Sequence, residues 1–240
     1  MILYYCSITH DPRLLNCFID KSSVLKNIPG FLVNFHFFPL LKTWLLIMME
    51  KIIRISNFLE KDQADSIENI LTGSNFPFFY QHELVTRSID TYKGKLNLTE
   101  YQFHFGHNLY KDGKKLSDFA GIPDIIYNKV KGLEEFKDKN FYIQRAKINC
   151  YTRQPEHFKS ESHVDVPNLK HFVILYSVNT NNGFTILNTV NEHDKTPNNI
   201  IIPSIKNTVV IFNGDIAHQA VFQTNTKLRL NVNFNIATKI

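Results

Sequence analysis

The C-terminal half of this chain is a succession of short β-rich segments, and this pattern constrains the fold more than any other feature. Seven runs rich in Val, Ile, Phe, Tyr and Thr are separated by turn residues, for example Asn182-Gly183 and Asn213-Gly214. The runs are residues 141–151, 172–178, 184–187, 200–202, 208–212, 218–222 and 228–236. Short strands joined by Asn and Gly turns predict a mainly β fold, either a sandwich or a jelly-roll barrel.

Helical signals come earlier in the chain. Residues 60–71 place four apolar side chains at helical spacing, namely Ala64, Ile67, Ile70 and Leu71. Gly73 follows as a stop signal, and Ser117 can cap a second helix that runs to about residue 133. We therefore expect N-terminal α-helices that support the β-rich half.

Residues 1–48 differ from the rest, since they hold eight aromatic residues, only six charged residues and no alanine. One interpretation is a short helical or disordered extension, and another is an over-extended reading frame whose true start is Met49. A third, less favoured interpretation is a membrane segment within residues 28–49. A lysine such as Lys42 near the centre of a span adds about 2.5–3.5 kcal/mol to the free energy of membrane insertion. The predicted folded domain is residues 49–240, which is long enough to bury a core.

Charge and cysteine content narrow the function classes. The chain has a formal net charge of +5, and residues 1–48 contribute +2 of it through four basic and two acidic side chains, which leaves +3 for the domain. That excess is too small to favour nucleic-acid binding. Cys6, Cys17 and Cys150 show no paired spacing, which argues against a disulfide scaffold and favours a cytoplasmic protein.

The residue types of a metal site occur within the β-rich half. His163 and Asp165 are two positions apart, so on an extended strand both side chains point the same way. His218, on a later strand, can complete a set of two imidazoles and one carboxylate, which suits ferrous iron, although Mn, Co, Ni or Zn could occupy the same positions. Arg229 follows at the start of the last β-rich run, where a guanidinium can hold a carboxylate through two hydrogen bonds.

Several motifs resemble, in order, those of the Fe(II)/2-oxoglutarate-dependent oxygenases. The resemblance covers residues 50–240 and is closest to the prolyl-hydroxylase-like branch and its small phage and bacterial members. Its most specific parts are Arg145-Ala-Lys147-Ile-Asn149-Cys-Tyr151, Ser162-His163-Val-Asp165, Tyr176-Ser-Val-Asn179-Thr-Asn-Asn-Gly183-Phe-Thr185, Phe212-Asn-Gly214 before His218, and Arg229. The fold that it implies is the double-stranded β-helix, or jelly roll.

The resemblance also implies an enzyme and its cofactors. His163, Asp165 and His218 would be the catalytic metal ligands for Fe(II), and Arg229 would pair with the distal carboxylate of 2-oxoglutarate. O2 would be the second co-substrate, with ascorbate as an optional addition. The presence of Asp165 favours hydroxylation over halogenation, because related halogenases have a small residue at this position.

Two tyrosines are further candidates for co-substrate binding by resemblance, namely Tyr151 and Tyr176. Close relatives often have a second tyrosine where this chain has Ser177. Tyr176 and Ser177 point to opposite faces of a strand, so only one of them can face the site. Thr185 is a weaker candidate, for which a role as a core or edge hydroxyl is the alternative.

The substrate class is less constrained than the site. In the nucleic-acid repair branch the last strand carries a second arginine where this chain has Asn233, which disfavours damaged-base repair. A prolyl or other protein side chain is favoured by the resemblance, and a small molecule remains open. Arg145 and Lys147 either line the substrate entrance or form a solvent-facing row. The alternatives to an oxygenase are a non-catalytic jelly-roll ligand-binding module and a cupin-like metalloenzyme.

Overall fold

The computed structural model describes residues 52–81, 103–137, 139–191 and 196–238, and all of them belong to one compact unit. The interpretations made for residues 1–48 and for a start at Met49 therefore lie outside the described residues. No helix within the described ranges is long and apolar enough to cross a membrane.

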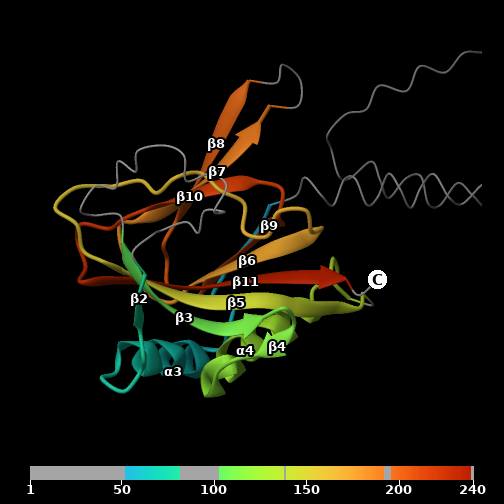
Figure 1. Cartoon of the computed structure of the whole chain (residues 1–240), viewed down its shortest axis with the longest axis horizontal. Helices are drawn as coiled ribbons and strands as arrows, with labels where there is room; N and C mark the ends of the chain where they lie inside the picture. Colours follow the sequence, from blue (N-terminus) through green and yellow to red (C-terminus); the bar gives the residue numbers. More distant parts are fainter. Residues whose placement is uncertain (1–51, 82–102, 138, 192–195, 239–240) are drawn as a thin grey trace, which may run out of the picture. The chain divides into compact units, whose positions relative to one another are not determined.

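The described strands form two antiparallel sheets (Figure 1). The larger sheet has the strand order β1 (Ile53–Ser56), β9 (Thr208–Asn213), β6 (His171–Ser177), β11 (Leu228–Thr238), β5 (Phe141–Thr152), β3 (His104–Lys111) and β2 (Phe79–Gln81), with β4 (Lys114–Lys115) paired to β3. The smaller sheet has the order β10 (Ala217–Val221), β7 (Phe184–Val190) and β8 (Pro197–Pro203). All seven predicted β-rich runs are strands, within a few residues of the predicted bounds.

The chain alternates between the two sheets, as a double-stranded β-helix requires. After β5 in the larger sheet, residues 159–163 lie along β10 of the smaller sheet through isolated bridges, Lys159 to Val221 and His163 to His218. The chain then returns to the larger sheet as β6, enters the smaller sheet as β7 and β8, and repeats this exchange with β9, β10 and β11. The predicted jelly roll is thus confirmed.

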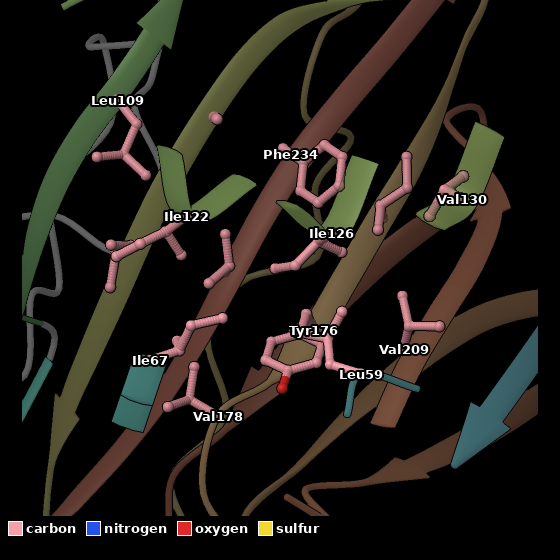
Figure 2. Close-up of a cluster of buried hydrophobic side chains, with 14 of the residues drawn as sticks. Leu59, Ile67, Leu109, Ile122, Ile126, Val130, Tyr176, Val178, Val209 and Phe234 are labelled. Carbon is pink, nitrogen blue, oxygen red and sulfur yellow. The ribbon is translucent and has the colours of Figure 1, made fainter. Parts of the chain in front are cut away.

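Two helices precede β5 in the chain and pack on one face of the larger sheet. Helix α3 (Lys61–Thr72) confirms the prediction for residues 60–71. Helix α4 (Gly121–Lys131) starts later than predicted, because Ser117 caps a short 3-10 helix (Asp118–Ala120) instead. The apolar sides of both helices meet the sheet in the main core, where Figure 2 shows Ile67, Ile122, Ile126 and Val130 near Tyr176, Val209 and Phe234.

The opposite face of the larger sheet meets the smaller sheet. A second, smaller apolar cluster lies there, made of Val173, Leu175, Leu187, Ile202, Val210 and Phe212. It is contributed by β6 and β9 of the larger sheet and by β7 and β8 of the smaller sheet. The remaining space between the sheets is lined mainly by polar side chains and forms a pocket.

Candidate functional site

The pocket between the two sheets brings together most of the residues that the sequence singled out. Strands β5 and β11 of the larger sheet supply a polar wall of alternate residues, while β7, β10 and the 160–165 segment supply the facing wall. The lining residues are Arg145, Lys147, Asn149, Tyr151, Ser160, His163, Asp165, Val173, Leu175, Thr185, Phe212, His218, Ala220, Arg229, Asn231 and Asn233.

Backbone pairing holds the two candidate histidine ligands side by side. The His163 amide donates to the His218 carbonyl (3.1 Å) and the His218 amide donates to the His163 carbonyl (2.9 Å). Asp165 Oδ1 lies 3.8 Å from His163 Nε2 and 3.9 Å from His218 Nε2. One potential ligand atom from each of the three residues lies within 4.8 Å of the others.

These three residues fit a metal ion. Three atoms at such separations can all lie near the about 2.0–2.2 Å at which nitrogen and oxygen ligands bind first-row metals such as zinc. The Nδ1 atoms of His163 and His218 lie 3.2 Å from the Glu161 carbonyl and 3.4 Å from the Ile216 carbonyl, which leaves Nε2 free to face the ion. Burial lowers the pKa of His218, more than the nearby Asp165 raises it, and a neutral imidazole is the form that binds metals.

Asp165 is held as an anion by three side chains of β5 and β11. Arg145 Nη1 donates to Oδ1 (3.0 Å), while the amides of Asn233 (3.1 Å) and Asn235 (3.0 Å) donate to Oδ2. Burial by itself raises the pKa of this carboxyl, but the charge of Arg145 and the hydrogen bond from Asn235 outweigh it and help to hold the pKa well below its usual range. The carboxylate is therefore ionised and oriented before any metal binds.

Arg229 is a buried cation whose described partners are all neutral. Its Nε donates to Ser204 Oγ (2.8 Å) and its Nη2 donates to Thr185 Oγ1 (2.9 Å), while the buried Nη1 has no hydrogen-bond partner among the described residues. The guanidinium lies over the Tyr151 ring, 5.2 Å from its centroid. Burial lowers the pKa of Arg229, and none of the described carboxylates is within salt-bridge distance of it. A buried, unpaired guanidinium favours an anionic ligand, because a charge in such a place is costly without a partner.

Gly183 makes room for this arginine. A Cβ atom at Gly183 would lie 2.8 Å from Arg229 Cδ, 2.9 Å from Asn181 Oδ1 and 2.9 Å from the Val221 carbonyl oxygen. Such distances are too short for any side chain, so the Asn182-Gly183 turn has a packing role as well as a turn role.

The two candidate tyrosines lie in different places. Tyr151 is buried in the pocket, where its ring stacks on His104 with centroids 5.5 Å apart. Tyr176 lies in the main core on the helix side of the sheet (Figure 2). Its hydroxyl donates to Asn207 Oδ1 (3.2 Å). The structure therefore does not bring Tyr176 into the pocket, because strand alternation in β6 turns its side chain to the opposite face. Ser177 is not among the lining residues, and it is Thr185 that supplies a hydroxyl beside Arg229.

Arg145 and Lys147 line the pocket, so the solvent-facing row considered for them is wrong. Sequence reasoning missed the partners of the site: Asn235 at Asp165, Ser204 at Arg229 and His104 at Lys147. Alternation along β11 could have indicated Asn235, because it shares a face with Arg229. Ser204 lies in the loop after β8, and no sequence pattern predicts its contact with Arg229.

Comparison with known proteins concerns the fold. No family model matches the sequence, and no curated protein matches it. A 2OG-Fe(II) oxygenase family oxidoreductase from Burkholderia pseudomallei matches with a TM-score of 0.54 and 11% identity, over 78% of this chain and 84% of that one. The non-heme alpha ketoglutarate dependent epimerase SnoN of nogalamycin biosynthesis matches with a TM-score of 0.54 and 6% identity, over 83% of this chain and 84% of that one.

A prolyl hydroxylase from Trichoplax adhaerens, solved with a hypoxia inducible factor peptide, matches with a TM-score of 0.49 and 14% identity, over 83% of this chain and 92% of that one. This likeness is too weak to favour the prolyl-hydroxylase branch. The fold of the described chain is thus the one found in 2-oxoglutarate and Fe(II) oxygenases. At such low identities the likeness shows the fold alone, and the activity is argued from the pocket.

Proposed function

We propose that this chain is an Fe(II)- and 2-oxoglutarate-dependent oxygenase that hydroxylates its substrate and releases succinate and CO2. One observation carries the proposal: the His163, Asp165 and His218 set and the unpaired guanidinium of Arg229 line the same pocket. A metal site alone fits many enzymes. A buried cation beside it fits a co-substrate that has a metal-chelating end and a second carboxylate.

The residues have separate roles in this proposal. His163, Asp165 and His218 would hold Fe(II), and three protein ligands would leave coordination positions open for other ligands. Arg229, oriented by Ser204 and Thr185, donates from Nη1 to the distal carboxylate of 2-oxoglutarate. Tyr151 packs against the guanidinium and keeps water from it.

Fe(II) bound there would supply the oxygen chemistry, in which one atom of O2 enters succinate as CO2 is lost and the other converts a substrate C–H to C–OH. The similar structure SnoN, with a TM-score of 0.52 and 8% identity, was solved with Fe3+, alpha ketoglutarate and nogalamycin RO. This supports the same pair of cofactors here. SnoN is an epimerase, so analysis of the product distinguishes hydroxylation from epimerisation.

For the substrate we propose a prolyl or other protein side chain, with a small molecule as the second candidate. The order of the sequence motifs supports the first, and the small molecule in the SnoN complex supports the second. A binding partner that is a nucleic acid is disfavoured by the modest charge of residues 49–240.

Succinate formation is the test of the proposed reaction. The purified domain is incubated with Fe(II), 2-oxoglutarate and O2, and succinate is measured by NMR with and without candidate peptides. Formation of succinate that needs iron and oxygen, and that is lost in His163→Ala, is the expected result. Binding of 2-oxoglutarate without turnover under any condition would favour the ligand-binding module, and oxygen-independent activity of the zinc-loaded protein would favour the cupin-like alternative.

A further inference from the structure

Lys147 is a second cation in the pocket, and the proposed co-substrate does not account for it. It lies on β5 between Arg145 and Tyr151. Arg145 is hydrogen-bonded to Asp165, and Tyr151 packs against Arg229. In the pairing of β5 with β11, Lys147 is opposite Asn233, and Tyr151 is opposite Arg229. The alternate residues Arg145, Lys147, Asn149 and Tyr151 thus share one face of β5, which lines the pocket.

The side chain of Lys147 is fixed by the strand next to it. A Cβ atom at Gly106 of β3 would lie 2.6 Å from Lys147 Cε and 3.3 Å from Nζ, so the glycine provides the space that the lysine occupies. The Lys147 ammonium donates to His104 Nε2 (2.8 Å). Burial lowers the pKa of His104 to about 3, so this imidazole is neutral and acts as an acceptor.

No described carboxylate forms a salt bridge with Lys147. Burial and the nearby charge of Arg145 lower the pKa of Lys147 to about 8, so the amine is still mainly protonated at neutral pH. An ammonium has three N–H donors, and the bond to His104 uses only one of them. Within the described part of the chain, two donors are therefore available to a ligand.

The charge of the pocket leads to the same conclusion. The described lining residues include three cationic side chains, Arg145, Lys147 and Arg229, and one carboxylate, Asp165, which gives a net charge of +2. Fe(II) and the 2-oxoglutarate dianion sum to zero, so the loaded pocket would retain this excess. A pocket of one sign attracts a ligand of the opposite sign.

We propose that Lys147, supported by His104 and Gly106, binds an anionic group of the substrate, either a carboxylate or a phosphate. This inference rests on the proposed function, because it assigns Arg229 to 2-oxoglutarate and leaves Lys147 for the second ligand. It makes Lys147 a residue that determines substrate specificity.

The test uses inorganic phosphate and acetate as probes of the protein loaded with substoichiometric Mn(II) and saturating 2-oxoglutarate. Broadening of the phosphate 31P line and of the 13C-acetate line reports an anion held close to Mn(II). The variants are Lys147→Gln, the charge-conserving Lys147→Arg, and Lys111→Gln, an exposed lysine of β3 that serves as the matched control. Circular dichroism and the Tm show whether each variant is folded.

We expect at least one probe to bind the wild type and the Lys111→Gln variant equally. Lys147→Gln should weaken that binding about tenfold, the loss expected for one charge-assisted hydrogen bond, and Lys147→Arg should restore part of it. The probe that binds more tightly identifies the group as phosphate or carboxylate.

Three results would overturn the inference. One is the absence of any broadening of either probe line in the wild-type protein. Another is broadening that Lys147→Gln leaves unchanged, which would place the anion on the metal itself. The third is a loss of 2-oxoglutarate affinity in Lys147→Gln as large as that in Arg229→Ala, which would make Lys147 a co-substrate ligand while the proposed function stands. Failure of the wild type to bind 2-oxoglutarate at all would instead contradict the proposed function.

Discussion

The two faces of β11 are both buried, yet one is apolar and packs in the core while the other is polar and faces the pocket. On one face, Leu230, Val232, Phe234 and Ile236 are at most 1% exposed and pack in the main core. On the other, Arg229, Asn231, Asn233 and Asn235 are at most 8% exposed and line or support the pocket. The first face is satisfied by apolar contacts within the chain. The second contains Arg229 Nη1 and Asn233 Oδ1, which have no hydrogen-bond partner among the described residues.

Alternate residues of one strand can therefore serve stability and function separately. The period of two sends neighbouring side chains to opposite faces, so a change on one face need not disturb the other. Substitutions on the apolar face should therefore change the free energy of unfolding, and substitutions on the pocket face should change ligand binding.

The largest effect is expected at the metal ligands. His163→Ala should lower iron-dependent turnover by at least about 10³-fold, because even the loss of a residue that only orients a metal ligand costs about 10–100-fold. The His163 side chain is 23% exposed, so its truncation should leave the fold intact. Succinate formation and the Tm measure the two effects. His157→Ala, at an exposed histidine, is the matched control and should behave as the wild type; equal losses in both would contradict the assignment.

The apolar face is tested by Phe234→Ala. Phe234 is fully buried among the main-core residues, so its truncation should cost about 3–5 kcal/mol in the free energy of unfolding. Denaturant unfolding measures this cost. Phe79→Ala, at a phenylalanine that is 57% exposed, should cost less than about 1 kcal/mol. Similar costs at the two positions would mean that the core is misassigned.

Arg229→Met should weaken 2-oxoglutarate binding without lowering the thermal stability of the ligand-free protein. Loss of a charged partner of the 2-oxoglutarate carboxylate should weaken its binding at least about 30-fold, equivalent to about 2 kcal/mol. Removal of an unpaired buried cation should leave the Tm of the ligand-free protein unchanged or higher. Calorimetry and thermal unfolding measure the two, with Arg54→Met of β1 as an exposed control. A lower Tm with unchanged affinity would show that Arg229 is a structural residue.

Gly183→Ala tests whether the pocket face depends on close packing. The added methyl group must push against Arg229 and a backbone carbonyl, and such overpacking costs about 1–3 kcal/mol. The displaced guanidinium should also weaken 2-oxoglutarate binding, by a smaller factor than Arg229→Met. Gly121→Ala is the matched control, because nothing lies within 4 Å of its added Cβ atom. The same response in both variants would argue against this account.

The smallest effect is expected for Tyr176→Phe. The lost hydroxyl makes a single hydrogen bond to Asn207, whose Oδ1 also accepts from the Leu59 amide, so stability should fall by at most about 1 kcal/mol. The 2-oxoglutarate affinity should not change, since Tyr176 faces the helices. A clear fall in that affinity would show that Tyr176 contributes to co-substrate binding, and it would contradict the assignment of separate roles to the two faces.

Much of this arrangement could be predicted from the sequence, because local patterns encode it. The runs of β-branched and aromatic residues indicated the strands, and the spacing of His163 and Asp165 on an extended segment indicated a shared metal site. The choice between Tyr176 and Ser177 could not be made, since alternation shows that two residues differ in face but not which face meets the pocket. The pairs Arg145 with Asp165 and Lys147 with His104 join segments far apart in the chain, so their contacts depend on strand register.

The central claim is that one pocket binds both Fe(II) and 2-oxoglutarate. Anaerobic titration of both into the purified protein of residues 49–240, followed by visible absorption, tests it most directly. A weak charge-transfer band that requires both compounds and is lost in His218→Ala is the predicted result. A folded, iron-loaded protein that gives no band on addition of 2-oxoglutarate would contradict the account.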